Sequence, residues 1–184
     1  MKGTGGCSVI NYDLVVIGSG AGLMVLEAAL QQGLRCAIIE KSKFGGTCLT
    51  KGCIPSKMLV YPADYLRETE RAAQIGIRVQ PPQIEWDTIS RRMWEQIDYH
   101  KKILQNLIKL PNLTVYQGTC TFTGTHTISV HYGDDRAADE LHGDRFVIAT
   151  GARSFVPDIR GLEETGYITS ELFFGDKYPD KPWD

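Results

Sequence analysis

The sequence predicts an α/β fold, a doubly wound, Rossmann-like parallel sheet with a small antiparallel β piece. The first observation is a short apolar run at residues 12–17 that ends directly before Gly18-Ser19-Gly20. The second is residues 21–32, which are rich in helix-forming Ala, Leu, Met and Glu and stop at Gly33. The third is a further apolar run at 35–39. Strand, turn, helix and strand within about thirty residues make a βαβ unit, whose two strands are parallel.

The glycine turn has the features of a nucleotide-binding turn. Glycines let the backbone approach a ligand closely, and a helix N-terminus attracts a pyrophosphate through its unpaired N–H groups and its dipole. Glu40 lies twenty residues past Gly20, where an acid can accept hydrogen bonds from a ribose diol. In the pattern G-x-G-x-x-G the third glycine falls on Leu23, and Gly22 lies one place early. We therefore expect a slightly wider contact between this helix and its strand.

The rest of the chain alternates helices and short strands. A helix is predicted at 56–73 with a kink at Pro62. Asp87 is a candidate N-cap for a long amphipathic helix that runs to about residue 110. Strands are predicted at 113–117, 119–122, 127–132 and 145–149. The antiparallel insertion is expected at about 113–145, packed against the parallel sheet.

Cys48 and Cys53 are the most informative pair of residues, with four residues between them. Glycines flank this loop, and Pro55 restricts the backbone beyond it, so a disulfide between the two would be strained and labile, as redox disulfides are. A structural bridge and a metal clip remain as alternatives. A bridge over so few residues removes little unfolded-chain entropy, and a zinc site requires a second ligand pair. The other cysteines and the histidines are scattered: Cys7, Cys36, Cys120, His100, His126, His131 and His142.

The composition limits the expected partners and compartment. The net charge is -2, from 20 basic and 22 acidic residues, so there is no electrostatic case for nucleic acid or for an anionic membrane. No apolar run is long enough to span a bilayer, and the N-terminus has no signal-peptide pattern. We expect a cytoplasmic protein. In a reducing compartment a disulfide persists only where turnover remakes it, which favours a redox role for Cys48 and Cys53.

Together these motifs resemble the N-terminal flavin-binding part of the class I pyridine nucleotide–disulfide oxidoreductases. That family includes dihydrolipoamide dehydrogenase, glutathione reductase, mercuric reductase and mycothione reductase, and residues 57–64 look most like the last of these. The cysteine block is the most specific of the motifs. The resemblance covers residues 12–182 and rests on four ordered elements: Gly18 to Gly22, Glu40 with Lys41, Gly45 to Lys57, and Ala149-Thr150-Gly151.

The resemblance implies a role for each of these elements. FAD would be the cofactor, with its pyrophosphate at the glycine turn and its adenosine ribose at Glu40. Cys48 would be the interchange thiol that attacks the substrate, Cys53 the charge-transfer thiol nearer the flavin, and Lys57 a cation beside the reactive edge of the flavin. Cys120 would contact the adenine through its backbone. The catalytic residues are thus expected to be Cys48, Cys53 and Lys57, with no metal ligand. The expected cofactor-binding residues are Gly18, Ser19, Gly20, Ala21, Gly22, Glu40, Lys41, Gly46, Thr47, Cys48, Lys57, Cys120, Thr150 and Gly151.

The implied activity belongs to a longer parent protein. That parent would pass electrons from NAD(P)H through FAD to a Cys48–Cys53 disulfide, and on to a small disulfide or a metal ion, as a homodimer. We expect a flexible N-terminus at 1–10, an FAD-binding domain at 11–175, and a linker at 176–184 toward an NAD(P)-binding domain. On this view the chain is a fragment that is inactive alone. The alternative is a truncated flavin- or nucleotide-binding remnant without catalytic activity.

Overall fold

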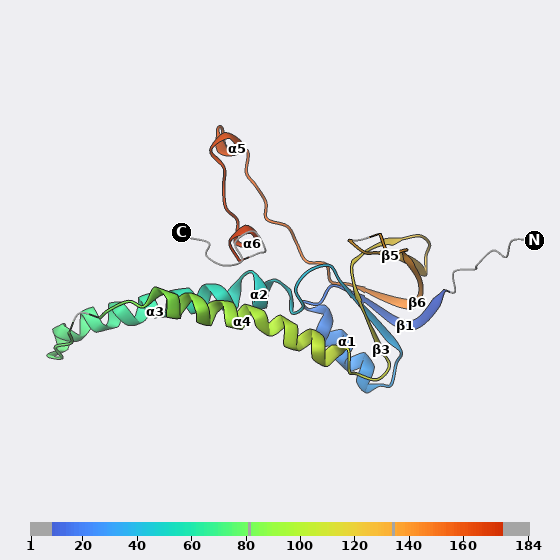
Figure 1. Cartoon of the computed structure of the whole chain (residues 1–184), viewed down its shortest axis with the longest axis horizontal. Coiled ribbons are helices and arrows are strands. Elements are labelled where there is room, and N and C mark those ends of the chain that lie inside the picture. The colour runs from blue at the N-terminus through green and yellow to red at the C-terminus, as the bar shows by residue number, and fades with distance from the viewer. Residues whose placement is uncertain (1–8, 81, 134, 175–184) are drawn as a thin grey trace, which may run out of the picture. The chain divides into compact units, whose positions relative to one another are not determined.

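The computed structural model describes residues 9–80, 82–133 and 135–174 (Figure 1). The linker expected at 176–184, and all but the last two residues of the N-terminus expected at 1–10, lie outside these ranges. The described chain divides into two compact units. One, the sheet unit, comprises residues up to 46 together with 101–152, and the other, the helical unit, comprises 47–100 together with residues from 153 on. The single FAD-binding domain expected at 11–175 stays a prediction.

A mixed six-stranded sheet forms the sheet unit, in the order β3-β2-β1-β6-β5-β4. β1 is parallel to β2 and to β6, and β2 is parallel to β3. Helix α1 connects β1 to β2, so the predicted βαβ unit and the α/β class are confirmed. The elements of this unit are β1 (Ile10–Ile17), α1 (Gly22–Gln31), β2 (Cys36–Glu40), β3 (Leu113–Gln117), β4 (Thr119–Phe122), β5 (Thr127–His131) and β6 (Asp139–Ile148).

The antiparallel part of the sheet is smaller than the sequence predicted. β5 is antiparallel to β6 and β4 to β5, but β3 is parallel to β2. The piece expected at about 113–145 therefore begins at β4, and it continues the parallel sheet through shared hydrogen bonds. β6 also begins at Asp139, earlier than the predicted start at 145. Its first half is polar in sequence, yet it pairs with β5 on one side and β1 on the other, which fixes it as a strand.

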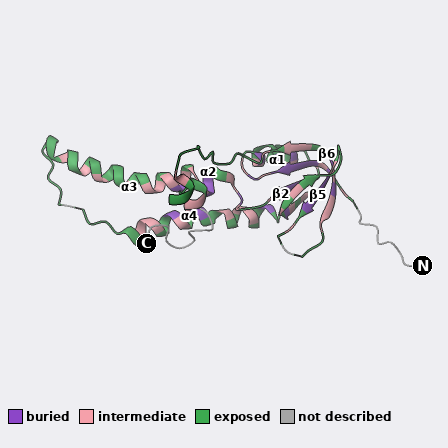
Figure 2. Cartoon of the chain, turned by 90° about the horizontal axis from the view of Figure 1, so that it is seen from above, coloured by how far each residue is buried: buried purple, intermediate pink, exposed green. Residues whose placement is uncertain are grey.

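The two faces of the sheet are buried in different ways (Figure 2). Leu14, Val16 and Ile38 on one face pack against α1 and against Leu107 near the end of a long helix. On the other face, Val15 and Ile39 belong to a cluster that includes residues of β5 and β6, and none of the described helices contributes to it. The antiparallel strands thus cover a face that a doubly wound sheet would cover with helices.

Two tyrosines form a polar contact inside this second cluster. Tyr12 and Tyr116 are 3% and 5% exposed, and their hydroxyl oxygens are 2.7 Å apart. Their rings meet edge to face, with the Arg35 guanidinium 5.2 Å from the Tyr12 ring centroid. Desolvation, followed by the hydrogen bond with Tyr12, raises the pKa of Tyr116 well above its ordinary value. Each buried hydroxyl therefore finds its partner in the other, as buried phenols require.

Gly22 is the site of closest contact between α1 and the sheet. A Cβ added there would lie 2.7 Å from Val16 Cγ1 and 3.2 Å from Ala149 Cβ. Leu23 instead packs at the edge of the apolar cluster beneath α1. The wider helix–strand contact expected from Leu23 is therefore wrong, because Gly22 provides the close approach one position earlier.

The helical unit begins with two helices around the cysteine pair. α2 (Gly46–Thr50) includes Cys48, and α3 (Cys53–Ala72) begins at Cys53 itself, earlier than the predicted start at 56. Pro55 lies in the first turn of α3, where a missing N–H costs no helical hydrogen bond. Pro62 lies inside α3, which is assigned as one helix through it.

A second long helix and three short ones complete the described chain. α4 (Trp86–Leu107) begins one residue before Asp87, so the N-cap prediction is wrong, and Asp87 instead places its charge in the first helical turn. Met93 and Ile97 of α4 are fully buried with Phe174. The remaining elements are the 3₁₀ helix η1 (Ala73–Ile75), α5 (Leu162–Thr165) and α6 (Ser170–Phe173). None of the helices in the described ranges combines the length and apolar character that a membrane crossing demands.

Gly22→Ala is expected to destabilise the sheet unit, because its methyl group would meet Val16 and Ala149. Overpacking of this kind costs about 1–3 kcal/mol of unfolding free energy, measurable by urea denaturation. Gly133→Ala is the matched control, since a Cβ there meets nothing within 4 Å. The double variant Gly22→Ala/Val16→Ala should lose less than the two single losses added together. Equal stability of Gly22→Ala and Gly133→Ala would contradict the packing role of Gly22.

Candidate functional site

The glycine turn lies at the carboxyl ends of three neighbouring strands. Gly18 has φ +100°, and a side chain there would collide with the carbonyl oxygen of Ala149, just past β6. Its N–H donates to the carbonyl of Ile39 in β2 at 2.8 Å. Thr150 follows directly, with its nitrogen 3.2 Å from the position of a Gly18 Cβ. Open parallel sheets bind ligands at this edge, beside the strand at which the order of successive strands changes direction. Here that strand is β1.

Helix α1 begins at this turn with unpaired donors. The N–H groups of Gly20, Ala21 and Gly22 donate no hydrogen bond to the described chain. They open a helix of ten residues, whose dipole adds partial positive charge at that end. Three free donors at a helix N-terminus fit a phosphate or pyrophosphate group. Because Gly20 has no side chain, a ligand can approach the backbone of this turn closely, as the sequence analysis expects.

Glu40 connects the turn to the loop that follows β2. Its Oε2 accepts hydrogen bonds from the N–H and the hydroxyl of Ser19, at 2.9 and 2.7 Å. Its Oε1 accepts from the N–H of Ser42 at 2.9 Å, and the Ser19 hydroxyl oxygen accepts from the N–H of Gly45 at 3.1 Å. A carboxylate offers about four acceptor positions, so Glu40 keeps capacity for a ribose hydroxyl while it orders the loop.

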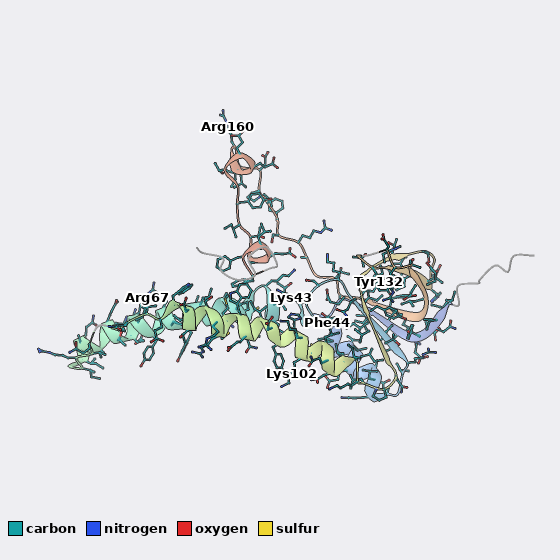
Figure 3. All side chains as sticks on the ribbon, viewed as in Figure 1. Lys43, Phe44, Arg67, Lys102, Tyr132 and Arg160 are labelled. Atoms are coloured by element: carbon teal, nitrogen blue, oxygen red, sulfur yellow. The ribbon has the colours of Figure 1, made fainter. Side chains whose placement is uncertain are left out.

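The loop after β2 returns to the glycine turn at Gly46. Gly46 has φ +70°, and a Cβ there would lie 2.5 Å from the Cα of Gly20. Phe44, labelled in Figure 3, is 1% exposed and anchors the loop in the apolar cluster beneath α1. The backbone of Gly46 therefore lies directly against the backbone of the glycine turn, a contact that a side chain at Gly46 would prevent.

The remaining residues of the sheet unit that are predicted to bind the cofactor lie at the same edge or near it. Gly151 has φ +73° and open space around it, and Lys41 is exposed after β2. The N–H of Gly118 donates to the carbonyl of Glu40 at 2.9 Å, which brings the start of β4 beside the acid. Cys120 is half-buried against the second cluster, and burial raises the pKa of its thiol. The Cys120 side chain therefore contributes to apolar packing.

In the helical unit, Cys48 and Cys53 are exposed free thiols. The disulfide ring inferred from their spacing is thus open here. Cys53 is the first residue of the twenty-residue helix α3, and the N–H of Ser56 bonds the carbonyl of Gly52 at 3.1 Å in its first turn. Gly52 packs against Thr47, which lies before Cys48 on α2. A hydrogen bond between the side chains of Cys48 and Cys53 brings the two thiols together.

The two thiols influence each other's ionisation. A hydrogen bond with Cys53 raises the pKa of Cys48, together with partial desolvation and the negative charge of Cys53. The Lys57 ammonium acts in the opposite direction and lowers the Cys48 pKa. Lys57 therefore opposes the effects of Cys53 and of desolvation, and the net effect is a raised Cys48 pKa.

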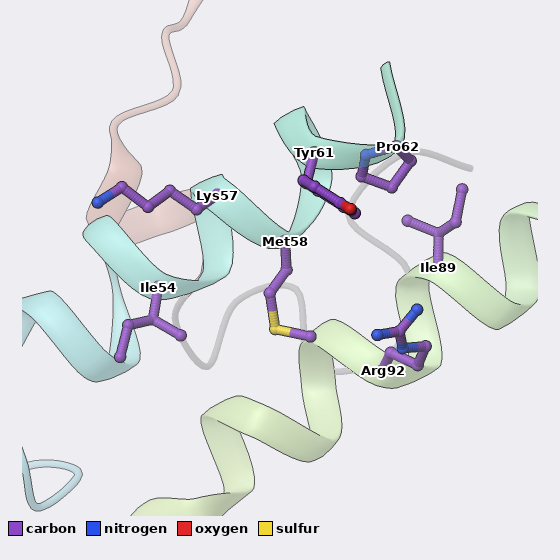
Figure 4. Close-up of a pocket in the computed structure, with 7 residues that line it drawn as sticks. All are labelled: Ile54, Lys57, Met58, Tyr61, Pro62, Ile89 and Arg92. Atoms are coloured by element: carbon purple, nitrogen blue, oxygen red, sulfur yellow. The ribbon is translucent and has the colours of Figure 1, made fainter. Parts of the chain in front are cut away.

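Lys57 also lies at a groove between α3 and α4 (Figure 4). The groove has a volume of about 290 Å³, and Met58 and Ile89 lie between the two helices. Its lining residues are Ile54, Lys57, Met58, Tyr61, Pro62, Ile89 and Arg92. The Lys57 side chain extends away from Met58 and Ile89 in this view, so its ammonium is available to other groups.

No group of three or more His, Cys, Asp or Glu side chains in the described ranges is arranged to hold a metal ion. His126 and His142 stack with ring centroids 5.8 Å apart, and His126 Nδ1 is 3.0 Å from the carbonyl oxygen of Gly143. These contacts bind the turn before β5 to β6.

Sequence reasoning missed the contacts that hold the loops in place. Ser19 is fully buried and joins Glu40 to Gly45, a role that its place inside a glycine motif does not signal. Lys51, between the two cysteines, pairs with Glu171 at 2.9 Å, although 120 residues separate them in the chain. Such a long-range pair leaves no periodicity in a single sequence.

Comparison with known proteins places these features in a family. Residues 12–177 match the family described as pyridine nucleotide-disulphide oxidoreductase. The chain is 35% identical over 163 residues to a dihydrolipoyl dehydrogenase of Bacillus subtilis, which covers 84% of this chain and 34% of that protein. It is 31% identical over 161 residues to a mycothione reductase of Mycobacterium tuberculosis, covering 87% and 35%.

A solved structure shows the same relationship. The Cu(II) complex of the HOCl-induced flavoprotein disulfide reductase RclA from Escherichia coli superposes with a TM-score of 0.66 at 31% identity, covering 81% of this chain and 30% of that one. The chain belongs to the pyridine nucleotide-disulphide oxidoreductase family, so the resemblance is confirmed. It spans about a third of the length of the curated relatives it matches.

Cys53→Ala is expected to lower the pKa of the Cys48 thiol, because the hydrogen bond and the negative charge that raise it are removed and Lys57 remains. The rate of iodoacetamide alkylation at Cys48, followed against pH by mass spectrometry, should then reach half its maximum at a lower pH. Lys57→Gln should move that midpoint upward.

Cys120→Ala, in the sheet unit, serves as the control and should leave the Cys48 midpoint unchanged. A midpoint that rises or stays fixed in Cys53→Ala would show that the two thiols do not interact.

Proposed function

We propose that this chain is the FAD-binding and redox-thiol part of a flavoprotein disulfide oxidoreductase. The whole protein passes electrons from NAD(P)H through FAD to the Cys48–Cys53 pair, and from there to a small disulfide or a metal ion. Family membership and the flavoprotein in the matching solved structure support the cofactor assignment. The Cu(II) complex of that structure supports the metal ion as a second substrate class.

One observation carries the proposal: the glycine turn and the thiol loop are joined at Gly46. The Gly46 backbone lies against Gly20, and Cys48 follows only two residues later. Since successive Cα atoms are about 3.8 Å apart, the Cys48 Cα lies within about 7–8 Å of the Gly46 Cα whatever the loop conformation. A dinucleotide cofactor on the turn and a reactive thiol are therefore held near each other by the chain itself.

The residues of the sheet unit fit FAD. The free N–H groups of Gly20, Ala21 and Gly22 would hold the pyrophosphate, and the remaining acceptor position of Glu40 would hold the adenosine ribose. Gly46 and Thr47 would line the flavin, and Lys57 would lie beside its reactive edge. Bound FAD supplies the hydride chemistry, which no protein side chain performs.

The thiol pair carries the exchange chemistry. The Cys48 thiolate attacks one sulfur of a substrate disulfide, forms a mixed disulfide and releases one substrate thiol. The Cys53 thiolate then attacks the Cys48 sulfur and releases the second substrate thiol, which leaves a Cys48–Cys53 disulfide. Two electrons have then passed from the pair to the substrate. Cys53 is the first residue of α3 and lies at the N-terminal end of that helix.

FAD added to the purified chain is expected to bind, with a visible flavin spectrum that remains after gel filtration. Gly46→Ala should weaken this binding by tenfold or more, on the order of 1.4 kcal/mol, because its methyl group displaces Gly20. Gly133→Ala is the matched control and should bind like the unchanged chain. A chain that stays colourless with saturating FAD would contradict the cofactor assignment.

Dithiol reduction of the FAD-loaded chain is expected to produce a long-wavelength absorbance band from a thiolate beside the flavin. The band should be lost in Cys53→Ser and kept in Cys48→Ser, because Cys53 is assigned the position nearer the flavin. Bound FAD with a spectrum unchanged by dithiol would support the binding remnant without catalysis. The reverse dependence on the two cysteines would exchange their roles.

A further inference from the structure

Ser19 lies in the middle of the glycine turn, and both of its hydrogen-bond donors are used within the protein. Its N–H and its hydroxyl donate to Oε2 of Glu40, at 2.9 and 2.7 Å. Its hydroxyl oxygen accepts from the N–H of Gly45 at 3.1 Å, and the residue is fully buried. Ser19 therefore acts on a bound nucleotide through Glu40 rather than by donating to the nucleotide itself.

The Glu40 carboxylate is held in one orientation. Glu40 is the last residue of β2, and its carbonyl accepts from the N–H of Gly118 at 2.9 Å, so its backbone is fixed. Oε2 takes both bonds from the buried Ser19, whereas Oε1 takes one bond, at 2.9 Å, from the N–H of the exposed Ser42. Oε2 therefore faces inward, and Oε1 lies on the solvent side.

The two carboxylate oxygens differ in the acceptor capacity that they have left. Each oxygen of a carboxylate has two lone pairs. Ser19 uses both on Oε2, and Ser42 uses one of the two on Oε1. Within the described ranges Glu40 has no further side-chain partner. One acceptor position is left, on Oε1, whereas a ribose offers two neighbouring hydroxyls.

We propose that Ser19 is a positioning residue, which orients the Glu40 carboxylate so that Oε1 alone accepts from the adenosine ribose. Glu40 then recognises one of the two ribose hydroxyls, and the other hydroxyl gains nothing from this side chain. The inference rests on the proposed function, because the ribose is that of FAD at the glycine turn. It adds which oxygen of Glu40 meets the ribose and which residue decides this.

The binding of three nucleotides to the purified chain, measured by isothermal titration calorimetry, tests the proposal. The probes are ADP, 2′-deoxy-ADP and 3′-deoxy-ADP, which carry the adenosine and pyrophosphate of FAD without its flavin. One deoxy analogue should bind on the order of tenfold more weakly than ADP, the scale of a hydrogen bond to a charged acceptor, and the other should bind within about twofold of ADP. Equal weakening of both analogues, or of neither, would overturn the proposal.

Ser19→Ala separates a positioning role from a structural one. Without the hydroxyl, Oε2 keeps only the bond from the backbone N–H and gains an acceptor position, so the affinity ratio of the two analogues should fall toward one. A partly unfolded chain would lose affinity for all three nucleotides by the same factor, which leaves that ratio unchanged.

Ser42→Ala is the matched control, because Ser42 contacts Glu40 through its backbone, and it should keep the ratio of the unchanged chain. Equal ratios in Ser19→Ala and Ser42→Ala would refute the role of Ser19. The comparison of analogues on the unchanged chain needs no variant, so it decides the proposal even where Ser19→Ala does not fold.

ADP carries no flavin, so this test and the flavin tests can fail separately. A chain that distinguishes the deoxy analogues but stays colourless with FAD would refute the flavin assignment and keep the role of Ser19. A chain with the dithiol-dependent flavin band that binds both analogues equally weakly would do the opposite. A chain that binds no ADP would overturn the assignment of Ser19 and Glu40.

Discussion

The fold depends on two places where one backbone segment lies directly against another. Gly18 fits under the carbonyl of Ala149, and Gly46 fits against Gly20, each with a positive φ. Any side chain at these positions would push the strand ends apart, because close-packed backbone cannot yield by the volume of a methyl group. The two contacts bring the end of β1, the end of β6 and the loop after β2 to one edge. The N–H groups at the start of α1, which lack partners as at any helix N-terminus, lie at this edge.

Hydrogen bonds then order what the glycines bring together. Glu40 and the buried Ser19 connect the turn, the end of β2 and the loop that leads to the thiols. A buried hydroxyl with both a donor and an acceptor partner gives directional order, since leaving either group unpaired would cost free energy. Packing of Phe44 adds the apolar anchor. The same few residues therefore order both the glycine turn and the loop after β2.

Local patterns in the sequence predicted much of this molecule. The runs of β-branched residues located β1, β2 and β3, and the motifs located the turn, Glu40 and the cysteine pair. The parallel partner of β3 was not predictable, because pairing direction depends on where the long helix α4 returns the chain. The polar first half of β6 was missed, since hydrogen bonds to two neighbouring strands outweigh its weak strand propensity. The ion pair between Glu171 and Lys51 was not predictable either, because only tertiary packing brings these two distant residues together.

The buried tyrosine pair sets a limit on the conditions in which the sheet unit stays folded. Tyr116 would ionise near pH 10 in an unfolded chain, and its hydroxyl resists ionisation in the folded one. Below pH 10 both states are neutral at this group, and the folded state keeps its full advantage. Above pH 10 the unfolded chain alone releases the proton, so stability falls steadily as the solution becomes more alkaline. Strong base would thus destabilise the sheet unit through this buried pair of tyrosines.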